Sequence, residues 1–346
     1  DEIVQTIFEQ RGIEDIDHFM NPTEEDLLPL DSLYRINEAY ERINIAIENN
    51  ENIAILADTD TDGITSGAII TRYLKNFTSN INTYIDNGKQ HGLVGQDLSQ
   101  FINADLIIIV DSLDNTDEQY KKLHNDNKDI VILDHHDIDP NIPYDDVCIL
   151  VSSQRNYKNT QLSGAGVTWK VCKYIDEQYS TNYADELVDL AACGILADVC
   201  GISEYDTENR YIVHKGLNNL TTLPLKKIIG SYEFNSKSIL FSVAPLINAS
   251  CRTNNNKTAL AMFLSDDNKE ILKLKKNLEK AKEEQRNEVD RILPDVYKML
   301  DNQKRRVLYA FTDTEFGING LIGNKCLEKY NKPLFINGSE NLNRAG

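Results

Sequence analysis

Four short, wholly apolar runs constrain the fold of this 346-residue chain more than any other feature of its sequence. The runs are "IAIL" (53–56), "LIIIV" (106–110), "IVIL" (130–133) and "CILV" (148–151). Continuous Ile- and Val-rich runs without polar alternation are typical of strands that are buried on both faces. Because helical stretches separate the runs, the sequence predicts an α/β fold built on a parallel sheet.

Helical patterns surround these strands and predict the domain organisation. The first fifty residues read as helices, in "DEIVQTIFEQRGI" and "INEAYERINIAIENNE", and a mostly helical stretch runs from about 162 to 225. Residues 266–300 predict a long amphipathic helix, with a kink expected at Pro294. After it, "RVLYAF", "GLIGNKCLEKYN" and "PLFING" predict a strand, a helix and a strand.

We therefore expect a parallel-sheet domain over 1–265, a connecting helix over 266–303 and the start of a smaller, incomplete α/β domain over 304–346. The long helix is the predicted boundary between the two domains.

Composition narrows the class of protein. Hydrophobic residues make up 41% of the chain and charged residues 26%, as in soluble globular proteins, and no apolar run approaches the ~20 residues of a membrane span. The chain begins at Asp1 without a signal-like segment, so we expect a processed product. The six cysteines form no CxxC pair and lie among apolar residues, which indicates reduced, buried thiols and a cytoplasmic location, and makes structural zinc improbable.

The net charge of −19 argues against a protein that coats nucleic acid nonspecifically, because phosphate binding depends on Lys and Arg. The negative net charge is compatible with an enzyme that binds phosphates through metal ions.

Acidic residues follow three of the predicted strands. Asp58 follows the first run, Asp111 the second, and Asp134 the third, where His135 and His136 come next. Ligands of open parallel sheets bind beyond the carboxyl ends of the strands, so these side chains are expected in one crevice.

The first of these segments, "DTDTDG" (58–63), also matches the opening of a calcium-binding EF-hand loop. That interpretation fails, because Ile69 stands at the twelfth position, where a bidentate Glu is required, and a strand enters the loop instead of a helix.

Four motifs, "DTDTDG", "VDSLDN", "LDHHD" and "ILADVCGISEYDTENR", resemble in order the motifs of DHH-family phosphoesterases, and specifically the RecJ-type single-strand-specific 5′→3′ exonucleases. The resemblance extends to the lead-in "RGIEDIDHFMNPTEEDLLPL", to "LSGAGVTWKV", to "APLINASCR" and to "FGINGLIGNKCLEKYNKPLFI". It therefore covers nearly the whole chain.

The resemblance implies a centre for two divalent cations, Mn²⁺ or Mg²⁺. The implied metal ligands are Asp60, Asp62, Asp111, His135 and Asp198. Asp111 would bridge the ions, His136 would contact the scissile phosphate, and Asp58 would be a ligand or an outer partner with a supporting catalytic role. Carboxylate oxygens with some imidazole suit Mn²⁺, and a bridging position requires a carboxylate because it offers two oxygens.

Further residues are expected around this centre. Asp134 is predicted to orient an imidazole, and Asn209 and Arg210 to hold the loop that follows Asp198. The predicted substrate contacts are Asn248, Arg252 and Lys89.

Several other features leave two interpretations open or predict no role. Gly164 and Gly166 would either cradle a phosphate or allow tight helix packing. Four lysines, which form either a solvated face or a strip that tracks a DNA backbone, are Lys269, Lys273, Lys276 and Lys280. Four histidines without an expected carboxylate neighbour are predicted to be surface or core residues: His18, His91, His124 and His214.

The chain departs from the RecJ pattern in places that concern substrate recognition. In "IDNGKQHGLVG" (85–95), Gly88 stands where the family has an Arg that helps recognise the 5′ end, and His91 stands at a Glu position; Lys89 is a less specific substitute. Leu246 replaces another Arg, and the chain stops at "NLNRAG", before a phosphate-binding loop, without an OB-fold. These departures fit a compact, phage-type relative or a shortened chain.

The predicted function is metal-dependent 5′→3′ hydrolysis of single-stranded DNA to 5′-mononucleotides, in recombination, repair or replication. The alternatives are a phosphodiesterase for short oligonucleotides or cyclic dinucleotides, and a catalytically silent replication scaffold. A single-strand-binding protein or a helicase is expected as a partner by analogy alone, and no membrane is expected.

Overall fold

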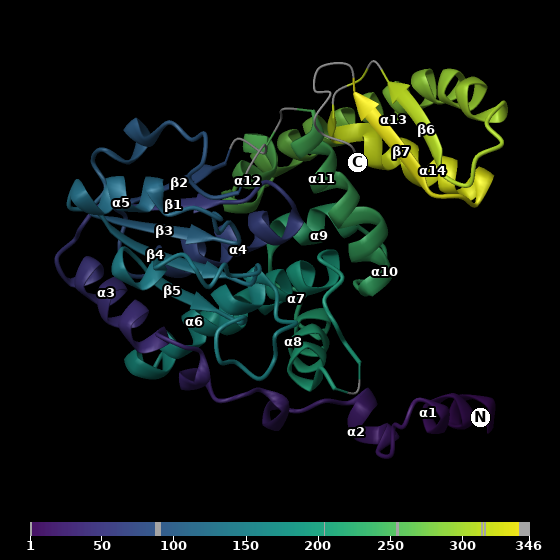
Figure 1. Ribbon diagram of the computed structural model, residues 1–346. Helices are drawn as coiled ribbons and strands as arrows, with labels where there is room; N and C mark the ends of the chain where they lie inside the picture. The colour runs from purple at the N-terminus through teal and green to yellow at the C-terminus, as the bar shows by residue number, and fades with distance from the viewer. Residues whose placement is uncertain are drawn as a thin grey trace.

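The computed structural model describes residues 2–86, 91–203, 205–253, 256–312, 314 and 316–338. It has an α/β architecture around a five-stranded parallel sheet with the order β2-β1-β3-β4-β5 (Figure 1). The strands are β1 (Ile53–Ala57), β2 (Ile81–Ile85), β3 (Leu106–Val110), β4 (Asp129–Asp134) and β5 (Ile149–Ser152). The predicted fold class is confirmed, and the four apolar runs correspond to β1, β3, β4 and β5.

The edge strand β2 is not among the apolar runs of the sequence. Its residues "INTYI" are only partly buried, whereas every residue of β1 and β3 is buried. An edge strand that is covered incompletely does not need a continuous apolar run.

Helices precede the sheet, lie between its strands and follow it. Those of the first part are α1 (Glu2–Gln10), α2 (Ile16–Met20), α3 (Ile36–Glu48), α4 (Thr61–Leu74) and α5 (Glu118–Asn125). Those after β5 are α6 (Gly164–Tyr179), α7 (Val188–Ala197), α8 (Thr207–Asn218), α9 (Leu223–Ile229), α10 (Ser236–Ser238), a π-helix (Ile239–Val243), α11 (Ala244–Arg252) and α12 (Asn256–Leu264). No helix in the described ranges is long and apolar enough to cross a membrane.

The sheet separates two apolar cores. Alternate residues of each strand point to opposite faces. Ile53 and Ile55 of β1 belong to the larger core with helices α3, α4, α6 and α7, whereas Ala54 and Leu56 belong to a smaller core with α5. Burial on both faces explains why the strands are apolar throughout.

A buried ion pair ties the N-terminal segment to the helices that follow the sheet. Lys170 of α6 and Glu208 of α8 are both almost fully buried, and Nζ lies 2.6 Å from Oε1. Lys170 Nζ also donates to the carbonyl oxygen of Leu28 and to the Tyr157 hydroxyl, and the Leu28 N–H donates to Glu208. Every partner of this buried pair is thus itself hydrogen-bonded, as buried charges require.

The long helix α13 (Asn268–Asp301) is capped by Asp267, whose carboxylate accepts the N–H groups of Lys269 and Glu270, and it continues through Pro294. Its C-terminal half packs on a two-stranded parallel sheet, β6 (Leu308–Thr312) and β7 (Leu334–Gly338), and on α14 (Asn319–Tyr330). This unit, yellow in Figure 1, has its own apolar cluster. The exact domain boundaries at 265 and 304 remain a prediction.

Candidate metal centre

The three central strands β1, β3 and β4 are neighbours, and each delivers an acid at its carboxyl end. Asp58 follows β1, Asp111 follows β3, and Asp134 is the last residue of β4. Asp60 caps α4, because its carboxylate accepts the N–H of Gly63 at 3.0 Å. The parallel order of the sheet therefore brings these acids to one edge.

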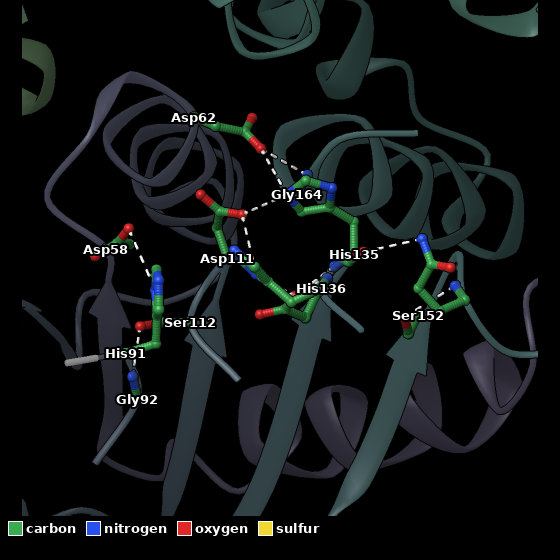
Figure 2. A network of polar contacts seen from close by, with 12 residues as sticks. Asp58, Asp62, His91, Gly92, Asp111, Ser112, His135, His136, Ser152 and Gly164 are labelled. Carbon is green, nitrogen blue, oxygen red and sulfur yellow. Dashed lines mark hydrogen bonds and ion pairs between the residues drawn. The ribbon is translucent and has the colours of Figure 1, made fainter. Parts of the chain in front are cut away.

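His135 lies at the middle of the group. Its Nε2 is 3.2 Å from Asp111 Oδ1, 3.6 Å from Asp62 Oδ2 and 3.8 Å from Asp198 Oδ2 (Figure 2 shows all of these residues except Asp198). Asp62 comes from the first turn of α4, and Asp198 is the C-cap of α7. Carboxylates from three other segments thus meet at the imidazole of His135.

Two residues at the centre have left-handed backbone conformations. Asp111 has φ 56°, and Val199, directly after Asp198, has φ 57°. Positive φ is uncommon for residues other than glycine, and it is a true outlier for a β-branched residue such as valine. Strain of this kind concentrates at functional sites, where the fold compensates for it.

Asp134 holds the second imidazole. Its Oδ1 accepts the backbone N–H groups of His135 and His136 and lies 2.8 Å from His136 Nδ1. Burial by itself would lower the pKa of His136. The hydrogen bond to Asp134 and the charge of that carboxylate outweigh burial and raise this pKa to about 9. The Nε2 atom of His136 is therefore a candidate donor to an anion.

The start of α6 anchors Asp62. The N–H groups of Gly164 and Ala165 donate to its two carboxylate oxygens at 2.7 and 3.0 Å. The positive end of the helix dipole adds to the stabilisation of this buried carboxylate. Of the two open interpretations of Gly164 and Gly166, close packing is the one that these contacts favour, because the Gly164 N–H is already used by Asp62.

Burial and the neighbouring carboxylates raise the pKa values of Asp60 and Asp111. Burial, followed by the charges of Asp58 and Asp62, raises the pKa of Asp60 to about 7. Burial also raises the pKa of Asp111 well above its usual range, with Asp62 and Asp60 adding to the effect. The Asp111 Oδ1 atom is buried without a hydrogen-bond partner in the described part of the chain. Cations would relieve this repulsion, so the residues fit a metal centre.

Three overlapping sets of side chains each have ligand atoms within 4.8 Å of one another, and Asp111 belongs to two of the sets and His135 to two. The sets are Asp58, Asp60 and Asp111; Asp111, His135 and His136; and His135, Asp198 and Cys200. Asp58 thus groups with the acids of the first loop. Sets that share a carboxylate are suited to a pair of cations.

Two cysteines, Cys200 and Cys251, lie beside the centre. Cys200 Sγ is 3.5 Å from Asp198 Oδ2, and the left-handed Val199 separates the two residues. Cys251 donates to Thr59 in the first loop at 3.0 Å. All six cysteines are nevertheless free thiols. No sequence spacing indicated these contacts, because they depend on a backbone reversal and on a distant helix.

Two of the three predicted substrate contacts, Asn248 and Arg252, lie on α11. Asn248 of α11 accepts a hydrogen bond from Thr61 at 2.8 Å, so α11 touches the first loop of the centre. Arg252, at the end of α11, is partly exposed, and Gly317 packs against its side chain. Lys89 lies outside the described residues.

Asn209 and Arg210 both contact the loop that follows Asp198. Asn209 Nδ2 donates to the Gly201 carbonyl at 2.8 Å, and Arg210 donates to the Ile202 carbonyl at 3.0 Å. Arg210 also lies over the Phe19 ring and donates to the Phe19 carbonyl. These contacts connect the loop to α8 and to the N-terminal segment.

Two histidines have carboxylate neighbours that the sequence did not suggest. His18 Nε2 lies 3.0 Å from Asp26, and His91 Nδ1 lies 3.6 Å from Asp58. Both histidines are exposed, in line with a surface position, but the expectation that they have no carboxylate neighbour is wrong. The ring of His91 also contacts that of His136, with the ring centroids 4.7 Å apart. His91 lies between the first two motifs in the sequence, and the fold brings its ring to the centre.

The lysines of the long helix are all exposed: Lys269, Lys273, Lys276 and Lys280. Lys280 forms an ion pair with Glu284 at 3.5 Å. Whether this face contacts DNA remains a prediction.

Comparison with known proteins shows what the part of the chain around this centre is similar to. A model of the DHH family, N-terminal domain, matches residues 52–195, which include β1 to β5 and nearly all of the centre. The part of the chain that holds the five-stranded sheet is therefore similar to the N-terminal domain of the DHH family.

Two curated relatives cover almost the whole chain. The SPbeta prophage-derived protein YorK of Bacillus subtilis (strain 168), provisionally assigned as a single-strand DNA-specific exonuclease, is 28% identical over 96% of this chain and 62% of its own length. The single-stranded-DNA-specific exonuclease RecJ of the same organism is 26% identical over 97% of this chain and 44% of its own length. The chain thus spans about half the length of these relatives.

The fold also matches a solved structure. The crystal structure of RecJ from Thermus thermophilus in complex with Mn²⁺ superposes with a TM-score of 0.81 and 24% identity, covering 96% of this chain and 49% of that one. The chain therefore has the fold of RecJ over the part that the two share.

Proposed function

We propose that this chain is a divalent-metal-dependent exonuclease that hydrolyses single-stranded DNA in the 5′→3′ direction and releases 5′-mononucleotides. The observation that carries the proposal is the buried Oδ1 of Asp111, which has no hydrogen-bond partner among the described residues and lies 3.2 Å from His135 Nε2, next to the acids of the first loop. A buried carboxylate oxygen without a partner is costly unless a ligand satisfies it.

Each residue of the centre has a role in this proposal. Asp58, Asp60 and Asp111 would hold one cation, and a second would lie among Asp62, Asp111, His135 and Asp198. When bound, Mn²⁺ or Mg²⁺ ions neutralise phosphate charge and lower the pKa of water. His136, held by Asp134, donates to the scissile phosphate from its Nε2.

The names of the relatives support the choice of substrate. Both YorK and RecJ of Bacillus subtilis are described as single-strand DNA-specific exonucleases, and the matched RecJ structure contains Mn²⁺. In the proposal, Asn248 and Arg252 on α11 guide the strand, because α11 contacts the first loop of the centre. Recombination, repair or replication is the proposed cellular role.

The test compares the wild-type chain with Asp111→Asn on a strand labelled at its 5′ end, with Mn²⁺, Mg²⁺ or EDTA and with a duplex control. We expect the wild type to release the labelled mononucleotide as its first product when Mn²⁺ or Mg²⁺ is present. We expect no such product in EDTA or from Asp111→Asn. Asp295→Asn, on the exposed side of α13, is the matched control and should cleave normally.

Other outcomes would identify the alternatives. Cleavage of dinucleotides with no activity on long strands would favour an oligonucleotide phosphodiesterase. Mn²⁺ binding without hydrolysis of any of these substrates would favour a silent scaffold, and full activity of Asp111→Asn would refute the proposed centre.

A further inference from the structure

A segment that starts at His91 enters the centre from the side of β2. The ring of His91 contacts two residues of the centre: its Nδ1 lies 3.6 Å from Asp58 Oδ2, and its centroid lies 4.7 Å from that of His136 (Figure 2). The two rings are tilted by 47°, and the His91 side chain is 50% exposed. The proposed reaction above gives this imidazole no role.

Buried hydrogen bonds hold the backbone of this segment. The Gly92 N–H donates to Ser112 Oγ at 2.6 Å, and Ser112 in turn donates to Asp86. The N–H of Leu93 donates to Asp114 at 2.8 Å, and the Leu93 side chain is fully buried. Gly92 has φ +68°, and a Cβ at this position would lie 2.5 Å from the Asp114 carboxylate. The fold thus specifies where the residue before Gly92 must lie.

The anchoring does not depend on the His91 side chain. The donors are backbone groups of the next residues, and Leu93 provides the apolar contact. A half-exposed imidazole adds little to packing, so its position over the centre needs an explanation other than folding.

The chemistry of the centre indicates what the ring would bind. The surrounding groups Asp58, Asp60, Asp62 and Asp111 are acids, which accept but do not donate when ionised. A phosphodiester that enters this acidic site needs N–H donors beside the cations. Nδ1 of His91 lies 3.6 Å from Asp58 Oδ2, beyond hydrogen-bond distance, so in the neutral ring the proton can be on Nε2, on a side chain that is 50% exposed.

We propose that His91 is a substrate-contact residue that, beside His136, binds a phosphate of the single strand through the ring nitrogen that faces away from Asp58. This inference rests on the proposed function.

The experiment measures strand binding and metal binding separately. The variants are His91→Ala, His91→Asn, which keeps an N–H donor, and the matched control His124→Ala on the exposed side of α5. The binding probe is a fluorescent phosphorothioate oligothymidylate with Mn²⁺, followed by anisotropy. Free Mn²⁺ is counted by electron paramagnetic resonance, and KM and kcat are measured on the unmodified strand.

We expect His91→Ala to bind the probe about 3–10-fold more weakly, the loss of one hydrogen bond, and to show a KM raised by a similar factor. Its Mn²⁺ affinity should equal that of the wild type, His91→Asn should bind at an intermediate level, and His124→Ala should be unchanged.

Unchanged probe binding in His91→Ala would overturn the inference. A fall in Mn²⁺ affinity that accounts for the whole loss of probe binding would also overturn it, because His91 would then be a metal ligand. If the wild type binds the probe but hydrolyses no strand, the proposed nuclease function fails, while the binding comparison still decides the role of His91.

Discussion

Gly164→Ala tests whether the first residue of α6 must be glycine because of the centre. A Cβ at Gly164 would lie 2.5 Å from Asp111 Oδ1 and 2.7 Å from Asp111 Cβ, whereas ordinary contacts begin at 3.4 Å. Asp111 would therefore have to move by about 0.9 Å, the difference between 3.4 and 2.5 Å. Asp111 is buried and its backbone is already in the left-handed region, so little relaxation is available.

The expected cost has two parts. Overpacking in a closed site costs ~1–3 kcal/mol, and the better helix propensity of alanine returns at most ~1 kcal/mol. We expect Gly164→Ala to lower the free energy of unfolding by ~1–2 kcal/mol in EDTA. Displacing a carboxylate of the centre should also weaken Mn²⁺ binding by ~10–100-fold, the range seen for residues that orient metal ligands.

Urea unfolding in EDTA and Mn²⁺ titration are the assays, with Gly320→Ala as the matched control. Gly320 lies in the first turn of α14, where a Cβ would meet nothing within 4 Å. Alanine there should leave stability unchanged or raise it by up to ~1 kcal/mol. If Gly164→Ala were as stable as Gly320→Ala and bound Mn²⁺ with wild-type affinity, the proposed close contact with Asp111 would be refuted.

Two further predictions concern buried charges away from the metal ligands. Glu208→Gln leaves the buried Lys170 ammonium without its counter-charge and should cost ~3–5 kcal/mol in urea unfolding. Adding Lys170→Met should recover part of that loss, so purely additive effects would contradict the pairing. Burial raises the pKa of Asp114 to about 6, so the folded state holds this proton more tightly than the unfolded state, and that stabilisation is lost as the pH rises through 6. Relative to Asp114→Asn, the wild type should lose roughly 1.4 kcal/mol between about pH 5 and pH 7.5 in EDTA; a constant difference would show that the carboxyl titrates normally.

Local sequence patterns determined much of the sheet and part of the centre. Strands buried on both faces must be apolar throughout, so β1, β3, β4 and β5 could be read from runs of Ile, Val and Leu. The acids that follow three of these strands could be predicted to lie close together, because the carboxyl ends of neighbouring parallel strands share one edge of the sheet. The edge strand β2 was less legible, because its partial exposure permits polar residues.

Only the tertiary structure decided which other groups reach that edge. The position of His91 is set by hydrogen bonds from the backbone N–H groups of the next two residues to Ser112 and Asp114. Cys200 lies beside Asp198 because the residue between them, Val199, has a left-handed backbone conformation. Neither contact has a spacing rule, because each depends on a chain reversal and on partners distant in sequence. Periodicity reports which face of an element is buried, but the meeting of separate loops depends on how the packed elements orient them.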